Sequence, residues 1–240
     1  MAQKTIDQPQ NPQSSKPSLW IKLTVASLIL VSALLISAWD LGWWQGWAYS
    51  MMMFAITVGG RIWADVRNPG LLAERAKAEK AENVKPWDKA LSPLMALTGT
   101  LALYMVAGLD HRFGWSPAFP TWLTIVGLLL VFLGYAFSTW AMLENRFFSG
   151  LVRIQWDCGH VVCDVGTYRV VRHPGYAGNL PALPGIVLGL ASLWAIIPAA
   201  LALVVTVIRT LLEDQTLQEE LPGYKEYAQR TCFRLIPGIY

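Results

Sequence analysis

The stretch from residue 166 to residue 240 decides the fold, because GTYRVVRHPGYAGN (166–179) and IRTLLEDQTLQEELPGYKEYAQRTCFRLIPGIY (208–240) enclose a long apolar run. From Pro174 to Ile208 the chain carries no charged residue. Polar groups suited to gripping an anionic ligand flank the run: Arg172, His173, Tyr176, Arg209, Glu213 and Tyr224. An ionisable cluster at the edge of a membrane segment is costly to keep there, so it marks a candidate functional site.

The composition indicates a membrane protein. Apolar residues make up 54% of the 240 residues, charged residues 15%, and the mean hydropathy is +0.39. A soluble domain normally carries about a quarter charged residues. Twelve tryptophans are typical of a protein with two interfacial belts. The net charge of +3 is too small to indicate a nucleic-acid partner.

Four apolar runs are long enough to cross a bilayer as helices: Leu19–Trp39, Trp43–Ala64, Leu91–Leu109 and Thr121–Leu143. The polar stretch 1–18 cannot bury enough apolar surface to fold, which predicts a disordered tail. It also lacks the basic region followed by an apolar region that is typical of a cleavable signal peptide.

The charge-free run is too long for one crossing and slightly short of two crossings of a core about 30 Å thick. We therefore expect two short or tilted helices with a turn near Ser192–Trp194, and a re-entrant hairpin is the competing interpretation. The predicted fold class is an all-α bundle of about six transmembrane helices. Residues 19–143 form its N-terminal part, and residues 144–240 form a C-terminal part that carries the site.

Basic residues predict the orientation. They gather before the first run, between the second and third, and on both sides of the charge-free run, whereas Arg112 alone falls on the opposite side. By the positive-inside rule, both termini face the cytoplasm. The segment 68–90 is expected to be a short interfacial helix followed by a polar turn, and a solvated connector is the alternative.

Three cysteines, Cys158, Cys163 and Cys232, lie in segments placed on the cytoplasmic side. They form no CxxC pair and have no histidine at metal-ligand spacing, which favours free thiols over a disulfide or a metal site.

Each site signal has a plain structural explanation when it is taken alone. Arg172 and His173 precede Pro174, which is favoured at a helix start, and the helix N-terminus there favours an anion. Arg209 and Glu213 share a helix face at i, i+4 spacing, as an ordinary salt bridge also would. Tyr224 lies in GYKEY (223–227), where tyrosines pack an adenine or anchor the membrane interface.

The order and spacing of these motifs are more specific than any one of them. GHVV (159–162), GTYRVVRHPGYAG (166–178), RTLLEDQTL (209–217) and LPGYKEYAQR (221–230) together resemble the isoprenylcysteine carboxyl methyltransferase family. Bacterial membrane methyltransferases and phospholipid N-methyltransferases share this C-terminal block. NPGLLAER at 68–75 is a weaker resemblance to bacterial members.

The resemblance implies an integral membrane enzyme that uses S-adenosylmethionine without a Rossmann domain. By position, it implies a cofactor pocket formed by His160, Val162, Tyr168, Arg172, His173, Tyr176, Glu213 and Tyr224. Arg209 and Glu213 are implied as catalytic residues where cofactor and substrate meet. Two positions depart from the family pattern: Thr167 replaces the usual Pro or Ile, and Asp214 replaces a second Glu with a shorter carboxylate.

The expected reaction is an in-line displacement on a sulfonium methyl group. An isoprenylcysteine-type carboxylate, the favoured acceptor, needs no base and would be clamped by Arg209, whereas a phospholipid amine would need Glu213 as the base. A small thiol is a further alternative, and a lipid tail would enter from the bilayer. A different class, an NADPH-dependent reductase of the sterol-reductase type, would need basic residues for the 2′-phosphate. The residues on offer are Arg169, Arg172, Lys225, Arg230 and Arg234. A non-catalytic scaffold or permease leaves the separated polar blocks unexplained.

Overall fold

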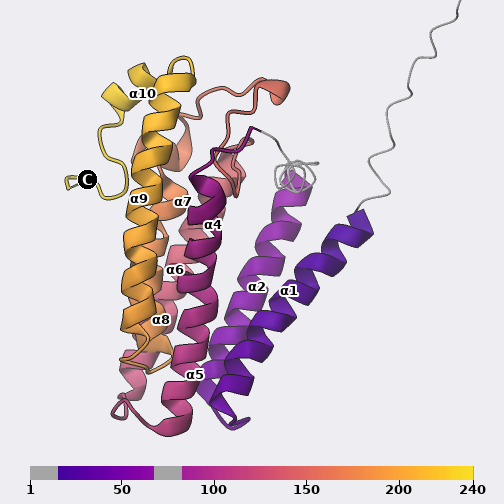
Figure 1. The fold of residues 1–240 in the computed structure, drawn as a ribbon, viewed down its shortest axis with the longest axis vertical. Coiled ribbons are helices and arrows are strands. Elements are labelled where there is room, and N and C mark those ends of the chain that lie inside the picture. The colour runs from indigo at the N-terminus through magenta and orange to yellow at the C-terminus, as the bar shows by residue number, and fades with distance from the viewer. Residues whose placement is uncertain (1–15, 68–82, 240) are drawn as a thin grey trace, which may run out of the picture.

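The computed structural model describes residues 16–67 and 83–239 as a bundle of helices, and these residues contain no strand. The predicted all-α class is therefore confirmed. The main part of the bundle consists of α1 (Lys16–Ala38), α2 (Trp44–Arg67), α4 (Asp88–Ala96), the π-helical η1 (Leu97–Ala102), α5 (Leu103–Phe113), α6 (Thr121–Glu144), α8 (Asn179–Gly189) and α9 (Ile196–Glu220). Short elements form the loop end: η2 (Trp156–Cys158), η3 (Gly166–Arg169), α7 (Pro174–Ala177) and α10 (Tyr224–Arg230). Figure 1 shows this end at the top of the molecule.

Three helices among the described residues are long and apolar enough to cross a membrane: Asp88–Phe113, Thr121–Glu144 and Ile196–Glu220. The part of α1 from Thr24 to Ala38 is apolar but shorter. Large apolar side chains such as Leu133 (60% exposed) and Val204 (55%) face outward from these helices. Such outward apolar surface is unfavourable in water and suits contact with lipid tails. NPGLLAER (68–75) lies outside the described residues, and so does most of the segment expected to form an interfacial helix, because the structure does not describe residues 68–82.

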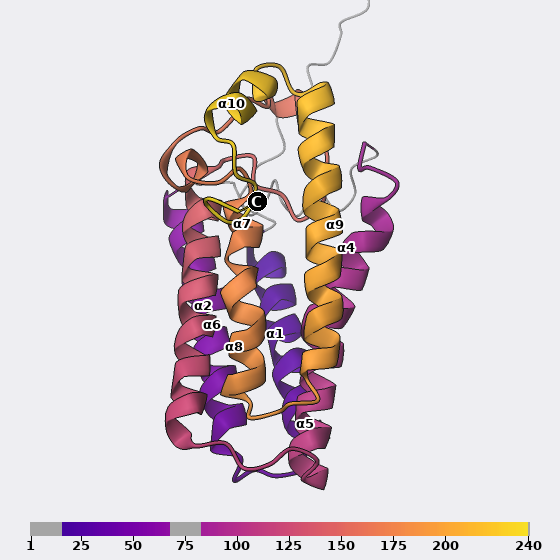
Figure 2. The same ribbon diagram turned by 90° about the vertical axis from the view of Figure 1, so that its left-hand side faces the viewer.

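The charge-free run forms a helical hairpin, in which two helices are joined by a turn at residues 190–195, where the turn was expected. Ser192 donates to Asp110 Oδ2 at 2.5 Å, and the Leu193 amide donates to Ser116 Oγ at 2.8 Å. These contacts fix the turn to the α5–α6 loop, at the end of the bundle remote from α10 (Figure 2). The hairpin therefore runs as far as the α5–α6 loop instead of turning back halfway.

The two arms of the hairpin differ in length, and of the expected short or tilted helices only the first is short. α8 has 11 residues, or roughly 16 Å, whereas α9 has 25 residues, or roughly 37 Å. α9 continues through RTLLEDQTLQEE because this segment consists mostly of good helix formers and contains neither glycine nor proline. It ends at Glu220, before Pro222 and Gly223.

Small residues let α6 and α8 approach closely, and the two helices lie side by side in Figure 2. A Cβ on Gly127 would lie 2.3 Å from the Gly189 nitrogen, and a Cβ on Gly134 would lie 2.4 Å from the Gly178 oxygen. Ser138 Oγ adds a hydrogen bond to the Gly175 carbonyl at 2.8 Å. Close backbone approach through glycine is a usual way for helices to pack in lipid, where no hydrophobic driving force acts between them.

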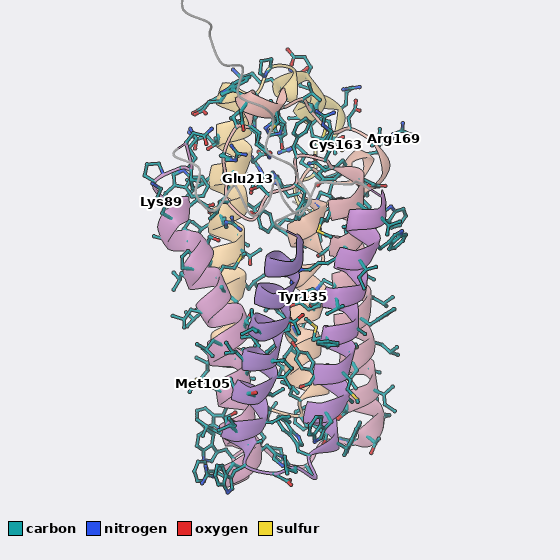
Figure 3. All side chains as sticks on the ribbon, turned by 90° about the vertical axis from the view of Figure 1, so that its right-hand side faces the viewer. Lys89, Met105, Tyr135, Cys163, Arg169 and Glu213 are labelled. Carbon is teal, nitrogen blue, oxygen red and sulfur yellow. The ribbon has the colours of Figure 1, made fainter. Side chains whose placement is uncertain are left out.

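The polar part of the molecule is concentrated at the α10 end. Figure 3 shows Glu213, Cys163 and Arg169 there, whereas Tyr135 lies within the helical part below them. None of the three cysteines, at 158, 163 and 232, forms a disulfide within the part of the chain that the structure describes.

Candidate functional site

A cavity of about 290 Å³ lies at the loop end of the bundle. Its wall comes from the segment after α6, from η3 and α7, and from α9 and α10. All of the site residues predicted from the sequence line it: His160, Val162, Tyr168, Arg172, His173, Tyr176, Arg209, Glu213 and Tyr224. Residues from two blocks separated by the apolar hairpin are thus brought to one cavity.

Glu144, at the end of α6, positions the entrance to η3. Its carboxylate oxygen Oε2 accepts hydrogen bonds from both the amide and the hydroxyl of Thr167, each at 2.6 Å. Gly166 has φ +54°, and a Cβ there would overlap the Glu144 carboxylate. Thr167 thus supplies a hydroxyl hydrogen bond that Pro or Ile could not make, and this contact holds the adjacent Tyr168 in the wall.

His160 forms an aromatic corner of the cavity with Phe147, their ring centroids 4.6 Å apart. Burial lowers the pKa of His160 to about 4, and the nearby Arg153 cation contributes to the shift. The ring is therefore neutral at pH 7. Nδ1 accepts the Gln155 amide at 3.3 Å, which leaves the proton on Nε2 as a donor.

Asp214, the shorter carboxylate that replaces a second Glu, is the centre of the polar network. It is 1% exposed and accepts both Arg172 Nε (2.7 Å) and Arg172 Nη2 (3.0 Å). His173 Nε2 and the Tyr224 hydroxyl each lie 3.2 Å from its Oδ1. Arg234 donates to Oδ2 at 2.9 Å. A charged aspartate is stable in this position because several donors surround it.

The Arg172 guanidinium is committed to the protein itself. Besides Asp214, it donates through Nη1 to the carbonyls of Thr231 (2.8 Å) and Cys232 (2.9 Å). The backbone amides of Arg172 and His173 pair with the carbonyls of Phe233 and Arg234. The geometry therefore favours a positioning role, in which Arg172 ties the C-terminal segment to the cavity wall, over the anion-binding role expected from its sequence position.

Arg209 is held by a carboxylate that the sequence analysis did not single out. Its Nε and Nη2 donate to Asp88 Oδ1 and Oδ2 at 2.6 and 3.0 Å, and Nη2 also donates to the Gly150 carbonyl at 2.7 Å. Asp88 is fully buried and accepts the Val152 amide at 2.6 Å as well. Arg209 was expected to hold a substrate carboxylate through two nitrogens. That fork is not free in the structure, since Nε and Nη2 already donate to Asp88. A lone acidic residue at the start of an apolar helix was the sequence signal for this partner.

Glu213 keeps a carboxylate oxygen available to the cavity. The Tyr176 hydroxyl donates to its Oε2 at 2.6 Å, and the other oxygen makes no hydrogen bond with the described residues. The Arg209 guanidinium carbon lies 5.5 Å from the centre of the Tyr176 ring. Arg209 and Glu213 both line the cavity, as their i, i+4 spacing predicted, but each has its own partner.

The two tyrosines of GYKEY pack into a small core beneath the cavity, with Ile154, Tyr168 and Leu221. Tyr227 donates to the Tyr168 carbonyl at 2.6 Å. Burial, followed by the Asp214 charge, raises the pKa of Tyr224 above its ordinary range, so its hydroxyl remains a donor. Sequence reasoning missed the opposite wall, which ENRFFSG (144–150) supplies through Phe147, Phe148 and Gly150.

Comparison with known proteins bears on the resemblance drawn from the motifs. Residues 122–222 match the phospholipid methyltransferase family. Probable protein-S-isoprenylcysteine O-methyltransferases from Oryza sativa subsp. indica and subsp. japonica are each 38% identical to this chain over 56 residues. The matched segment is 23% of this chain and 29% of either relative. The chain is thus similar, over residues 122–222, to phospholipid methyltransferases and, over a shorter stretch, to isoprenylcysteine methyltransferases, and the resemblance drawn from its motifs is confirmed.

Proposed function

We propose that this protein is an integral membrane methyltransferase that uses S-adenosylmethionine to methylate a lipophilic acceptor. The observation that carries the proposal is the cavity at the loop end, because it gathers every residue that the family resemblance assigns to cofactor and chemistry. A bound S-adenosylmethionine supplies a methyl group on a cationic sulfur, which leaves as a neutral thioether when the acceptor's lone pair takes the methyl carbon.

The residues present fit such a cofactor. Glu213 offers an open carboxylate oxygen to a cation, and the aromatic walls at Phe147, Tyr168 and Tyr176 offer ring faces. The neutral His160 offers an N–H donor. The chain's main task is then to orient two reactants in line, and fixed geometry of this kind supplies several kcal/mol of barrier reduction.

We place the acceptor's lipid tail in the bilayer beside the cavity. Met95 of α4 lines the cavity and belongs to a helix apolar enough to span a membrane. A tail lying against that helix would bring a headgroup nucleophile to Glu213. We propose about six crossings with both termini and the cavity on the cytoplasmic side, since the basic residues gather on that side.

An isoprenylcysteine-type carboxylate remains the first acceptor to test, because the matched rice relatives carry that name. Arg209 then contributes only its Nη1 nitrogen to the substrate, because Nε and Nη2 already bind Asp88 and Gly150. A phospholipid amine is the second candidate, and it is favoured by the pairing of Arg209 with Asp88, which leaves Glu213 as the carboxylate of the wall without a cationic partner among the described residues. A small thiol is a third.

The test is methyl transfer from radiolabelled S-adenosylmethionine to N-acetyl-S-farnesylcysteine, to phosphatidylethanolamine and to an alkyl thiol. Glu213→Gln should lower kcat/KM at least about a hundredfold with the true acceptor, because the carboxylate charge next to the transferred group is lost. Glu219→Gln, on the same helix and bonded to Gln215 at the exposed surface, is the matched control. Wild-type turnover in Glu213→Gln would refute the proposal.

A further inference from the structure

Three arginines line the cavity and are buried, but they differ in their partners. Arg172 and Arg209 each hold a carboxylate through two nitrogens, in Asp214 and Asp88. Arg153 is just as buried, with a side chain 5% exposed, and has no such partner. The family resemblance assigns it no role.

The contacts of Arg153 are weak for a buried cation. Nη1 lies 3.3 Å from Asp157, whose side chain is 59% exposed, and 3.5 Å from Asn83 Oδ1. Nε is buried without a hydrogen-bond partner among the described residues. An ion pair with an exposed carboxylate stabilises little. A buried guanidinium with an unsatisfied N–H is costly, and an unexplained case of this kind often marks a missing ligand.

The wall around Arg153 suits an anion. His160 is neutral and keeps its Nε2 proton, so it adds a donor and no competing charge. Glu213, on the α9 wall, is the one acidic side chain among the described residues that line the cavity. The other two arginines are already neutralised by their aspartates. Arg153 is thus the cation of the wall whose charge has no buried counter-charge.

We propose that Arg153 binds the anionic group, a carboxylate or phosphate, of a ligand held in the cavity. The guanidinium offers a planar fork suited to both groups. The proposal rests on the proposed function, because the ligand's anion has two sources there. One is the amino-acid carboxylate of the S-adenosyl cofactor, and the other is the acceptor's own carboxylate or phosphate.

Calorimetry on purified, detergent-solubilised protein separates these sources. S-adenosylhomocysteine carries the carboxylate, and 5′-methylthioadenosine lacks it. If Arg153 holds the cofactor, Arg153→Met should bind S-adenosylhomocysteine roughly tenfold to a hundredfold more weakly and 5′-methylthioadenosine as the wild type does. Arg230→Met is the matched control, since Arg230 is 68% exposed and pairs with Asp164 on the surface.

If Arg153 instead holds the acceptor, S-adenosylhomocysteine binding stays unchanged. In binding measurements, Arg153→Met then no longer binds N-acetyl-S-farnesylcysteine more tightly than its methyl ester, or phosphatidylethanolamine more tightly than a diacylglycerol. Either pattern supports the proposal.

Stability without ligand gives a second readout. Arg153→Met should melt at or above the wild-type temperature, because the fold no longer buries a poorly satisfied charge. Lower melting temperature with every probe bound as in the wild type would overturn the proposal and make Arg153 structural. Should Arg153→Met fail to fold, Arg153→Lys keeps the charge without the fork and should show the same selective loss in weaker form. A wild type that binds no S-adenosylhomocysteine would instead refute the proposed function.

Discussion

At the scale of single residues, the site depends on protonation states that the fold sets. His160 is the clearest case, since burial and Arg153 hold its pKa near 4. Because this value lies below the ordinary 6.5, the unfolded chain binds more protons between the two values. The stability that neutral His160 contributes is therefore full above pH 6.5 and is lost as the pH falls through about 4.

We therefore expect acidification from about pH 7.5 to about pH 4.5 to lower the melting temperature of the wild type more than that of His160→Gln. The variant removes the titrating ring but keeps a polar side chain of similar reach. Differential scanning fluorimetry of both proteins in the same detergent measures the difference. Equal losses in the two proteins would mean that His160 is already free to protonate in the fold.

Residue identities were predicted from the sequence better than residue roles. The motif residues all reach the cavity, because the resemblance fixed which positions meet. The roles of Arg172, Arg209 and Asp214 were not predictable, since each depends on a partner distant in sequence. Asp88 lies 121 positions from Arg209, and no local pattern joins them.

At the scale of elements, the Asp88–Arg209 pair fastens the start of α4 to the cavity end of α9. Asp88→Asn should destabilise the protein by about 3–5 kcal/mol, because it leaves the Arg209 charge buried without its partner. Adding Arg209→Met to the same protein should restore part of this loss. Lys85→Met, which breaks the more exposed pair between Lys85 and Glu220, should cost at most about 1 kcal/mol. Reversible unfolding in mixed micelles measures all four proteins, and a cost for Asp88→Asn no larger than for Lys85→Met would contradict this account.

The α6–α8 contact gives a second prediction at this scale. Gly127→Ala should lower the melting temperature markedly, because its Cβ would lie 2.3 Å from the Gly189 nitrogen, which cannot move without shifting α8. Gly59→Ala in α2 is the control, since a Cβ there meets nothing within 4 Å. That control should be neutral or slightly stabilising, by up to about 1 kcal/mol, because alanine favours a helix. A melting temperature unchanged in Gly127→Ala would show that the two helices are not closely packed.

Elements were predicted well where composition decides them. The apolar runs became helices, and the turn near Ser192–Trp194 was located correctly because the polar Ser192 lies near the midpoint of the run. The end of α9 lies well beyond the apolar run, because hydropathy reports where a helix leaves the apolar zone, whereas helix propensity decides where it ends.

At the scale of the whole molecule, the bundle has two unlike ends. One carries the cavity, α10 and the C-terminal segment, and the other carries the loops joined by Asp110, Ser116 and Ser192. In a variant that keeps Cys232 and lacks the other two native cysteines, Cys232 should react with a membrane-impermeant maleimide only from the cytoplasmic side. In a variant without any of the three native cysteines, Trp194→Cys should react only from the other side, because Trp194 is 50% exposed. Labelling of both positions from one side would contradict the proposed topology.

The central claim is that the loop-end cavity binds an S-adenosyl cofactor, and equilibrium binding tests it most directly. Isothermal titration of the purified protein with S-adenosylhomocysteine and, separately, with NADPH separates a methyltransferase from a reductase. We expect saturable binding of S-adenosylhomocysteine to the wild type. In His173→Ala the affinity should fall roughly tenfold to a hundredfold, because the variant lacks an imidazole that lines the cavity and is hydrogen-bonded to Asp214. NADPH should not bind. Binding of NADPH in place of S-adenosylhomocysteine would contradict the account.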